Sequence, residues 1–436
     1  MATPRTKEPD PDLGQGVVDK DRYLSPDIAA CELDRIFRRS WLYAVPAGDV
    51  REPGSWAVFD LGPESVLIVR TEDGALTAHH NVCQHRGRRL MDDERGRAAA
   101  FRCRYHAWTY RLDGELRTIH EPQLFPADLD RCALGLKAVR VEEWGGLVWI
   151  CLDPEAEPLL SYLAPLPEHL ACYHLDTFAI VVDQSVAWDC NWKVAVDAFH
   201  ETYHNLATHP QLMPVAGDVN VQIDCYARHS RFLLPSGVPA PAYRQRDRPT
   251  AAQIAAFARY DFDATGFEGT ADEVLAPFQR HKLAWLRDRG YPVDDLDPEQ
   301  VTENYHYTVF PNTQISFYPE RTLITRSRPH PSGDPGRMIF DLQSFEQVPA
   351  GADVPARPAT VRGAGPDVAL EPDFVRQDAA NVVRIQQGLR SSGYDGAQLG
   401  ALELRIRHWH AVYGRAMGLE GEHARGHDAT DGGGPP

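Results

Sequence analysis

The chain has 436 residues, 43% of them apolar, and its 45 basic against 62 acidic side chains give a formal net charge of −17. That length allows two or three domains with their own cores, and the negative charge argues against a nucleic-acid partner or an anionic membrane surface. No stretch reaches the ~20 apolar residues of a membrane helix, and the N-terminus lacks the apolar core of a signal peptide. We therefore expect a cytoplasmic protein, in which a paired Cys/His pattern indicates a metal site before a disulfide.

The first 44 residues are predicted to form an N-terminal arm and a helix that packs on the larger domain. Residues 1–22 are polar and are expected to be mobile. Ser25 followed by Pro26 is typical of a helix start, because the hydroxyl can cap the helix and proline suits its first position.

Residues 45–155 are predicted to form a small all-β domain. Its segments are short and alternate in polarity, and Asp73-Gly74 and Asp113-Gly114 are typical hairpin turns. Residues 154–170 contain four prolines and are interpreted as a linker.

Residues 156–420 are predicted to form the larger, mixed domain. Two inserted helices are expected to begin near Thr250 and Thr270, and the Pro- and Gly-rich segment 349–367 is expected to be a flexible loop. The tail 421–436 should be disordered. The predicted strands lie within 177–189, 219–235, 305–331 and 337–348, and the predicted C-terminal helices within 372–388 and 397–417.

Two Cys/His pairs in the β domain indicate a metal centre. Cys83 and His85 are followed, after 17 intervening residues, by Cys103 and His106. Two thiolates and two imidazoles suit tetrahedral zinc or a Rieske 2Fe-2S cluster, in which cysteines hold one iron and histidines the other. The mixed pairs favour the cluster, since zinc fingers group like ligands together.

A second constellation lies in Asn191–Pro210. If the segment is helical up to His204, then Val194, Asp197, Glu201 and His204 share one face. His209 lies five residues further, roughly 140° round an ideal helix, so the two imidazoles converge only if the helix unwinds near 206–208. The proline after His209 is consistent with such a break.

Both constellations resemble segments of one family. CQHRG with CRYHAWTYRLDG resembles the Rieske segment of the non-heme iron oxygenase α subunits, and NWK followed by ExYHxxxxH resembles the iron motif of the same family. The order and separation also match, so the resemblance covers the chain from about residue 20 to 420.

The resemblance implies a mononuclear Fe(II) held by His204, His209 and a distant carboxylate. Two imidazoles and one carboxylate on one face leave positions open for dioxygen and substrate. Asp378 is the expected carboxylate, because it interrupts an apolar helical stripe, where an unpaired charge is costly. Asp373 and Glu371, nearer the helix start, are explained by capping and the helix dipole.

Glu201 is expected to link His204 to a Rieske histidine, His106, of a neighbouring subunit. The family usually has aspartate at that position, whereas glutamate occurs in members resembling choline and carnitine oxygenases, so Glu201 slightly favours methylammonium compounds. Asp197 stands where many relatives have asparagine, and its role is left open.

The fold expected from the resemblance is α+β. It combines the Rieske domain with a helix-grip catalytic domain, in which an antiparallel sheet wraps a long C-terminal helix. We predict a terminal oxygenase that hydroxylates an aromatic substrate with dioxygen and with electrons from NAD(P)H, which arrive through a separate reductase and possibly a ferredoxin. A homotrimer is expected, with or without a β subunit.

Other classes of function remain open at this point. Oxidation or demethylation of a methylammonium compound is the alternative within the enzyme class. A zinc-stabilised ligand-binding module would leave Glu201, His204, His209 and Asp378 unexplained, and a simple electron-transfer Rieske protein would need only ~100 residues and one metal site.

Overall fold

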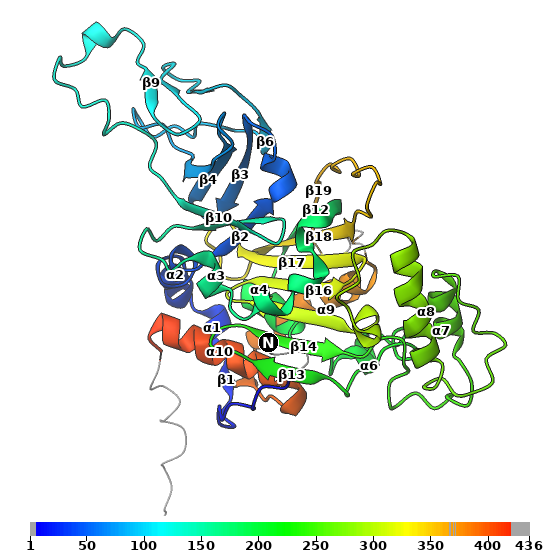
Figure 1. Ribbon diagram of the computed structural model, residues 1–436. Coiled ribbons are helices and arrows are strands. Elements are labelled where there is room, and N and C mark those ends of the chain that lie inside the picture. The colour runs from blue at the N-terminus through cyan, green and yellow to red at the C-terminus, as the bar shows by residue number, and fades with distance from the viewer. Residues whose placement is uncertain (1–5, 366–367, 369, 371, 420–436) are drawn as a thin grey trace, which may run out of the picture.

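The computed structural model describes residues 6–365, 368, 370 and 372–419. A smaller β domain extends from a larger domain that is built on one broad sheet with helices around it (Figure 1). This arrangement confirms the predicted α+β class. The predicted disordered tail 421–436 lies outside the described residues.

The smaller domain consists of three small sheets, with strand orders β5-β4-β3-β6, β7-β8-β9 and β10-β11-β2. Its hairpin turns include Gly74 and Gly114, which both have a positive φ, as the Asp-Gly pairs predict. Its strands are β2 (Leu42–Pro46), β3 (Ser55–Leu61), β4 (Glu64–Arg70), β5 (Leu76–His80), β6 (Arg95–Arg97), β7 (Phe101–Arg102), β8 (Thr109–Tyr110), β9 (Leu116–Thr118), β10 (Arg140–Trp144) and β11 (Leu147–Cys151).

The larger domain contains a sheet of eight strands in the order β13-β14-β15-β16-β17-β18-β12-β19. Neighbouring strands are antiparallel, except that β19 pairs with β12 in parallel. The strands are β12 (Phe178–Trp188), β13 (Gln222–Cys225), β14 (Ser230–Leu234), β15 (Asn304–Val309), β16 (Thr313–Tyr318), β17 (Arg321–Pro329), β18 (Met338–Gln347) and β19 (Val361–Ala364).

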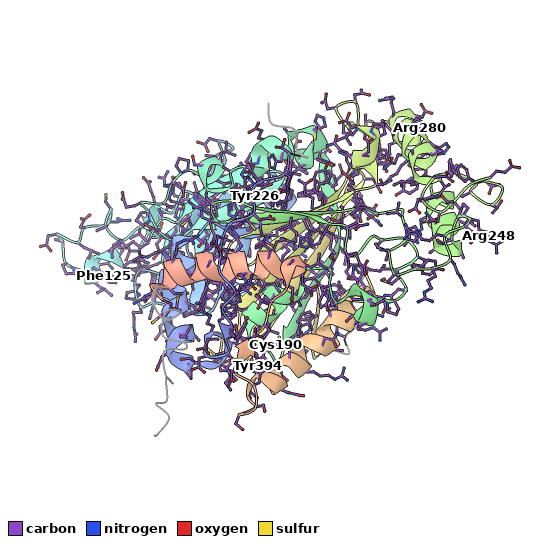
Figure 2. The ribbon with its side chains drawn as sticks, turned by 90° about the horizontal axis from the view of Figure 1, so that it is seen from below. Phe125, Cys190, Tyr226, Arg248, Arg280 and Tyr394 are labelled. Atoms are coloured by element: carbon purple, nitrogen blue, oxygen red, sulfur yellow. The ribbon has the colours of Figure 1, made fainter. Side chains whose placement is uncertain are left out.

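Helices flank this sheet, and α5 contacts β17, β18 and α9. Figure 2 shows the inserted segment with Arg248 and Arg280 at the opposite end of the molecule from Phe125 of the β domain. Among the described residues, no helix has the length and apolar character needed to cross a membrane. The helices are α1 (Asp21–Leu24), α2 (Pro26–Arg35), α3 (Leu159–Tyr162), α4 (Leu166–His169), α5 (Trp192–Ala198), α6 (Asn205–Thr208), α7 (Ala251–Ala258), α8 (Leu275–Asp288), α9 (Phe374–Leu389) and α10 (Leu404–Met417).

Two helices begin at the caps predicted from the sequence, and two others begin later in the chain than predicted. The Ser25 side chain accepts from the Ile28 amide at the start of α2, and Thr250 forms a capping box at the start of α7. In contrast, α8 begins after a turn in which Thr270 and Glu273 bond reciprocally. α10 begins at Leu404, after β20 (Gly396–Ala397), which pairs with β1 (Val18–Asp19), and after a 3-10 turn at Ala401–Glu403.

Two segments predicted to be irregular are held in place by specific contacts. The proline-rich linker forms α3 and α4, which bury Leu159, Leu163 and Leu166 in the core below β11. In 349–367, the Arg357 guanidinium bonds to Asp49 of the β domain and to Asp183 of β12. The expectation of a flexible loop is therefore wrong for this part of the segment, because the sequence pattern does not reveal a distant ion pair.

The N-terminal arm is also tied down where it is described. The Glu8 amide donates to Asp224, and Arg231 donates to the Thr6 carbonyl. Asp224 and Arg231 form a fully buried ion pair, 2.8 Å between Nε and Oδ2. The expected mobility does not apply to this part of the arm, since its backbone satisfies buried charges.

The central segment departs most from its predicted structure. α5 ends at Ala198, so the helix does not continue to His204 and the predicted shared face ends with it. The His200 carbonyl, which would accept from the His204 amide in a helix, accepts from Arg405 instead, at 3.0 Å. The His204 amide donates to Glu201. The break therefore precedes His204, and residues 206–208, where unwinding was predicted, lie within α6.

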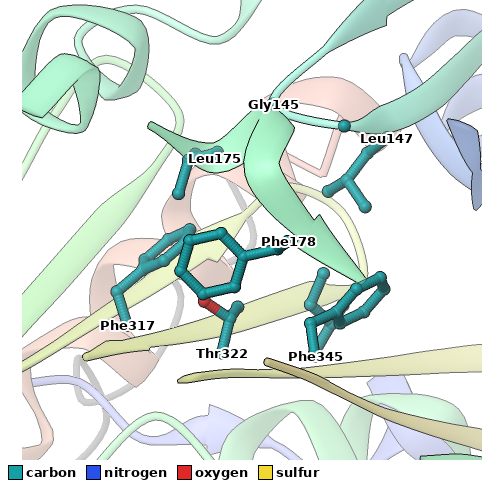
Figure 3. A pocket seen from close by; sticks show the side chains of 9 residues that line it. Gly145, Leu147, Leu175, Phe178, Phe317, Thr322 and Phe345 are labelled. Carbon is teal, nitrogen blue, oxygen red and sulfur yellow. The ribbon is translucent and has the colours of Figure 1, made fainter. Parts of the chain in front are cut away.

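The two domains meet at arginine contacts and around a small apolar cavity. Arg326 donates to the carbonyls of Tyr43 and Ala44, and Arg328 to that of Asp60, while both guanidiniums pair with Asp341. Figure 3 shows the cavity, which has a volume of about 20 Å³, about that of one water molecule, and contains none of the predicted metal ligands. Its lining includes Leu147, Leu175, Phe178, Phe317 and Phe345.

Candidate functional site

The two Cys/His loops of the β domain fold in the same way. The Gly87 amide donates to the Cys83 carbonyl, and the Ala107 amide donates to the Cys103 carbonyl. Gly87 and Ala107 both have a positive φ, of 72° and 61°, so each cysteine is followed by a tight left-handed turn that glycine favours. The sequence CQHRG provides a glycine in the first loop, whereas the second loop carries the strain on alanine.

These turns bring the four predicted ligands to one end of the domain. The rings of His85 and His106 lie 4.6 Å apart between centroids, and Trp108 stacks on His85 at 4.7 Å. Cys83 and Cys103 are buried, while both histidines are half-buried. The cysteines thus lie inside and the histidines at the tip.

The electrostatics of this end suit a metal group. Burial, His106 and Arg86 lower the pKa of His85, which keeps the imidazole neutral as a ligand. Burial raises the pKa of the Cys83 thiol, so a thiolate there requires a compensating cation. The Nδ1 atom of His85 is buried and has no hydrogen-bond partner in the described part of the chain. These residues fit a 2Fe-2S cluster with sulfur ligands inside and nitrogen ligands outside.

The second centre brings together His204, His209 and Asp378. His204 precedes α6, His209 follows it, and Asp378 comes from α9, yet one potential ligand atom from each lies within 4.8 Å of the others. The Nε2 atoms of the two histidines are 3.2 Å apart, and Asp378 Oδ1 lies 3.0 Å from Nε2 of His209. The described residues show no other such group of three. Two imidazoles and a carboxylate in this geometry fit a non-heme Fe(II) ion.

Asp378 faces inward because α9 is anchored on both sides of it. Val375, Ala379 and Val382 are buried in the main core, and the Asp378 side chain is only 5% exposed. A buried carboxylate needs a partner, and the nearest are the two imidazoles.

Glu201 orients His204. Its Oε1 atom lies 2.5 Å from Nδ1 of His204, which leaves Nε2 to face His209 and Asp378. Burial alone would lower the pKa of His204, but the hydrogen bond and charge of Glu201 outweigh it, and the pKa is raised. Such a carboxylate fixes the tautomer of a ligating imidazole.

Asp197 does not join this group. Its Oδ2 accepts from the Tyr23 hydroxyl at 2.6 Å and lies 3.2 Å from Nε2 of His410, so it links α5 to the N-terminal helix and to α10. No contact between Asp197 and His204, His209 or Asp378 is found among the described residues.

A cavity of about 380 Å³ opens beside the second centre. Asn381, Arg384 and Ile385 were not predicted from the sequence to line a cavity. Asn381 and Ile385 follow Asp378 by three and seven positions, which places these two on its side of α9, whereas Arg384 lies about 120° round the helix from Asp378. The cavity is lined by Ala198, Glu201, His204, Asp378, Asn381, Arg384 and Ile385.

Comparisons with known families identify both parts of the chain. The family model described as the ring hydroxylating alpha subunit (catalytic domain) matches residues 175–419, and the Rieske [2Fe-2S] domain matches residues 40–128.

Curated relatives match the chain over a shorter stretch. The chain is 33% identical over 191 residues to a glycine betaine monooxygenase oxygenase subunit of Chromohalobacter salexigens, covering 44% of this chain and 42% of the relative. It is 35% identical over 188 residues to the large oxygenase component of the naphthalene 1,2-dioxygenase system of Pseudomonas putida, covering 41% of each. The matches thus span less than half the length of these relatives.

Solved structures share the whole fold. A quaternary ammonium Rieske monooxygenase matches with a TM-score of 0.69 at 19% identity, covering 94% of this chain and 99% of that one. Naphthalene 1,2-dioxygenase with bound indole matches with a TM-score of 0.64 at 20% identity, covering 95% of each chain. The chain belongs to the ring-hydroxylating α-subunit family, in which a Rieske [2Fe-2S] domain accompanies the catalytic domain.

Proposed function

We propose that this protein is the terminal oxygenase component of a Rieske system and that it oxidises a methylammonium compound. The arrangement of His204, His209 and Asp378 beside an open cavity carries this proposal. When bound, the cluster would supply electrons and the ferrous ion would activate dioxygen. Cys83, His85, Cys103 and His106 would hold the first group, and His204, His209 and Asp378 the second.

The polarity of the cavity favours a charged substrate. Five of its seven lining residues are polar or ionisable, and none is Phe, Tyr or Trp. An aromatic hydrocarbon would be expected to need a more apolar lining. The lining contains both the carboxylate of Glu201 and the guanidinium of Arg384, so it suits a substrate with charged groups. Glutamate at this position and the similarity to a glycine betaine monooxygenase subunit point the same way.

Aromatic ring hydroxylation, the first expectation from the sequence, is kept as a second candidate. The similarity to the naphthalene dioxygenase component supports it at a comparable identity.

Purified enzyme with a matched reductase should consume NADH when a quaternary amine is added, and much less with aromatic compounds. The product should be an N-demethylated amine together with formaldehyde, identified by mass and by a colorimetric assay. A cis-dihydrodiol or phenol from an aromatic compound, without amine turnover, would reverse the choice between the two candidates. Iron and acid-labile sulfide, with a visible spectrum, test the metals at the same time, because a colourless zinc protein would exclude both.

We also propose a head-to-tail homotrimer, in which Glu201 of one copy faces His106 of the next. The tip beside His106 exposes Arg86 and Arg104, so this end of the β domain is accessible to a second copy. Tyr203 and Leu206, 67% and 59% exposed, lie in the same segment as Glu201 and suit a covered surface. A separate reductase, possibly with a ferredoxin, would supply electrons, and a β subunit is compatible with this arrangement.

Replacing Glu201 by glutamine should lower turnover about 10- to 100-fold while the iron and the cluster remain, because the amide can accept from His204 but carries no charge. The matched control is Glu403→Gln, since burial and, to a smaller extent, the nearby charge of Glu201 raise the pKa of Glu403, but Glu403 does not bond to His204.

Coexpression tests the role across subunits. Chains with Glu201→Gln and chains with His106→Ala, each of low activity alone, should regain activity when mixed, because an intact cluster then meets an intact Glu201 at some interfaces. If the mixture is no more active than the separate variants, electrons pass between His106 and Glu201 of the same chain.

We propose a cytoplasmic location, which the unbridged state of the eight cysteines supports, since thiols stay reduced there.

A further inference from the structure

The second imidazole of the iron site also has a partner, and it differs in charge from the first. Nδ1 of His209 lies 2.7 Å from Oε1 of Gln377, whereas Nδ1 of His204 faces the carboxylate of Glu201. We propose that Gln377 is a positioning residue of the mononuclear metal site, which fixes the tautomer and ring direction of His209 with a neutral group. The proposal concerns metal binding and is independent of the substrate.

The tautomer follows from the geometry of the ring. Nε2 of His209 lies 3.2 Å from Nε2 of His204 and 3.0 Å from Asp378 Oδ1, so this nitrogen faces the metal position. A metal binds the lone pair of a neutral imidazole, so the proton must reside on Nδ1. Nδ1 then donates, and the atom of Gln377 that faces it must be the carbonyl oxygen.

A further contact holds the Gln377 amide in that orientation. Nε2 of Gln211 donates to the same Oε1 at 2.7 Å. The Nδ1–H of His209 requires an acceptor, so it selects the carbonyl oxygen of Gln377, and the Gln211 amide then takes the orientation that donates to the same atom. Gln211 is exposed, so the contact lies at the outer edge of the site.

Helix α9 carries both the proposed ligand Asp378 and Gln377, the residue that supports the proposed ligand His209. Gln377 directly precedes Asp378 on α9, whose neighbours Val375 and Ala379 are buried. A small rotation of α9 would therefore displace Asp378 and, at the same time, the Gln377 side chain that holds His209. The core contacts of α9 thus set both elements of the metal geometry.

The neutrality of Gln377 has an electrostatic reason. A ferrous ion carries two positive charges, and the carboxylates of Asp378 and Glu201 offset both. A third carboxylate against His209 would add a further negative charge to a site where His209 and Asp378 are only 3% and 5% exposed, and its cost falls on the metal-free protein. Carboxylate partners nevertheless strengthen metal binding by ligating histidines, so glutamate at 377 should hold the metal at least as tightly.

The test compares Gln377→Met, Gln377→Glu and the control Gln387→Met in the full-length protein. Methionine keeps the size of the side chain and removes the acceptor, and Gln387 is exposed on the same helix. The first measurement is the ratio of iron to acid-labile sulfide after dialysis against a chelator, where the sulfide of the cluster serves as the internal reference. The second is the affinity of the site for Co(II), measured by competition.

Gln377→Met should weaken binding about 10- to 100-fold, whereas Gln377→Glu and Gln387→Met should retain it. An unchanged visible spectrum and melting temperature would show that Gln377→Met is folded. If Gln377→Met is unstable, Gln211→Met takes its place and should give a smaller loss of metal, since it frees the amide without altering α9. Retention of metal by the folded Gln377→Met protein, or loss of it in Gln377→Glu, would overturn the proposal.

Discussion

Replacement of Asp378 by alanine is expected to abolish turnover and to remove the mononuclear iron. Asp378 provides the only carboxylate among the three residues that converge at the site. Two imidazoles alone leave the metal with fewer ligands and without a charge to offset it, so the ion should dissociate into a chelator. The helix should tolerate alanine, which has the highest helix propensity and is flanked at this position by the buried Val375, Ala379 and Val382.

The measurement is iron per acid-labile sulfide, together with substrate-dependent NADH consumption. The visible spectrum of the cluster should be unchanged, because the four proposed ligands in the β domain are not altered. Asp373→Ala is the matched control, since that carboxylate is 69% exposed and pairs with Arg376 three positions later. Normal iron content in Asp378→Ala would show that the third ligand lies elsewhere.

The sequence was most informative where chemistry requires particular residue types. Cys83, His85, Cys103 and His106 could be identified because two short loops repeat a thiol and an imidazole, and no core or surface pattern needs that combination. Asp378 could be identified because a carboxylate interrupts an apolar stripe. The strands of the main sheet were found from β-branched and aromatic runs, which reflect burial directly.

The sequence was least informative where structure depends on one distant contact. α5 ends early because Arg405, more than 200 positions away in the chain, takes the His200 carbonyl. Arg357 anchors a segment that looks like a loop by composition. Gln377 could not be distinguished from an ordinary helix glutamine, since its partner His209 lies on another segment. Local propensity does not encode such contacts.

Replacing Glu32 by alanine should lower the free energy of unfolding by about 3–5 kcal/mol. Glu32 of α2 is 2% exposed and accepts from Lys193, from Nε1 of Trp192 at 2.7 Å and from the Tyr413 hydroxyl at 2.6 Å. Alanine would leave all three donors buried without this acceptor. Lys193 is fully buried and would retain an uncompensated charge, which is the largest part of the cost.

The pH dependence of the free energy of unfolding tests whether the buried charge of Lys193 causes the loss of stability in Glu32→Ala. Burial lowers the pKa of Lys193, and Glu32 opposes the shift, so removing Glu32 should lower it further. In the unfolded chain the pKa of Lys193 is about 10.4, and in the folded protein it is lower. Between these two pKa values the unfolded chain binds more protons than the folded protein, so the free energy of unfolding rises with pH. The deficit of Glu32→Ala should therefore shrink from pH 7 to pH 9, as followed by urea unfolding with tryptophan fluorescence.

The control for this prediction is Asp34→Ala on the same helix. Asp34 is 66% exposed and pairs with Arg38 at the surface, so its loss should change stability by less than about 1 kcal/mol. A deficit in Glu32→Ala that does not vary with pH would assign the cost to packing and hydrogen bonds instead. Because Lys193 lies in the first turn of α5, whose far end leads into Glu201, the same substitution should also loosen the metal site.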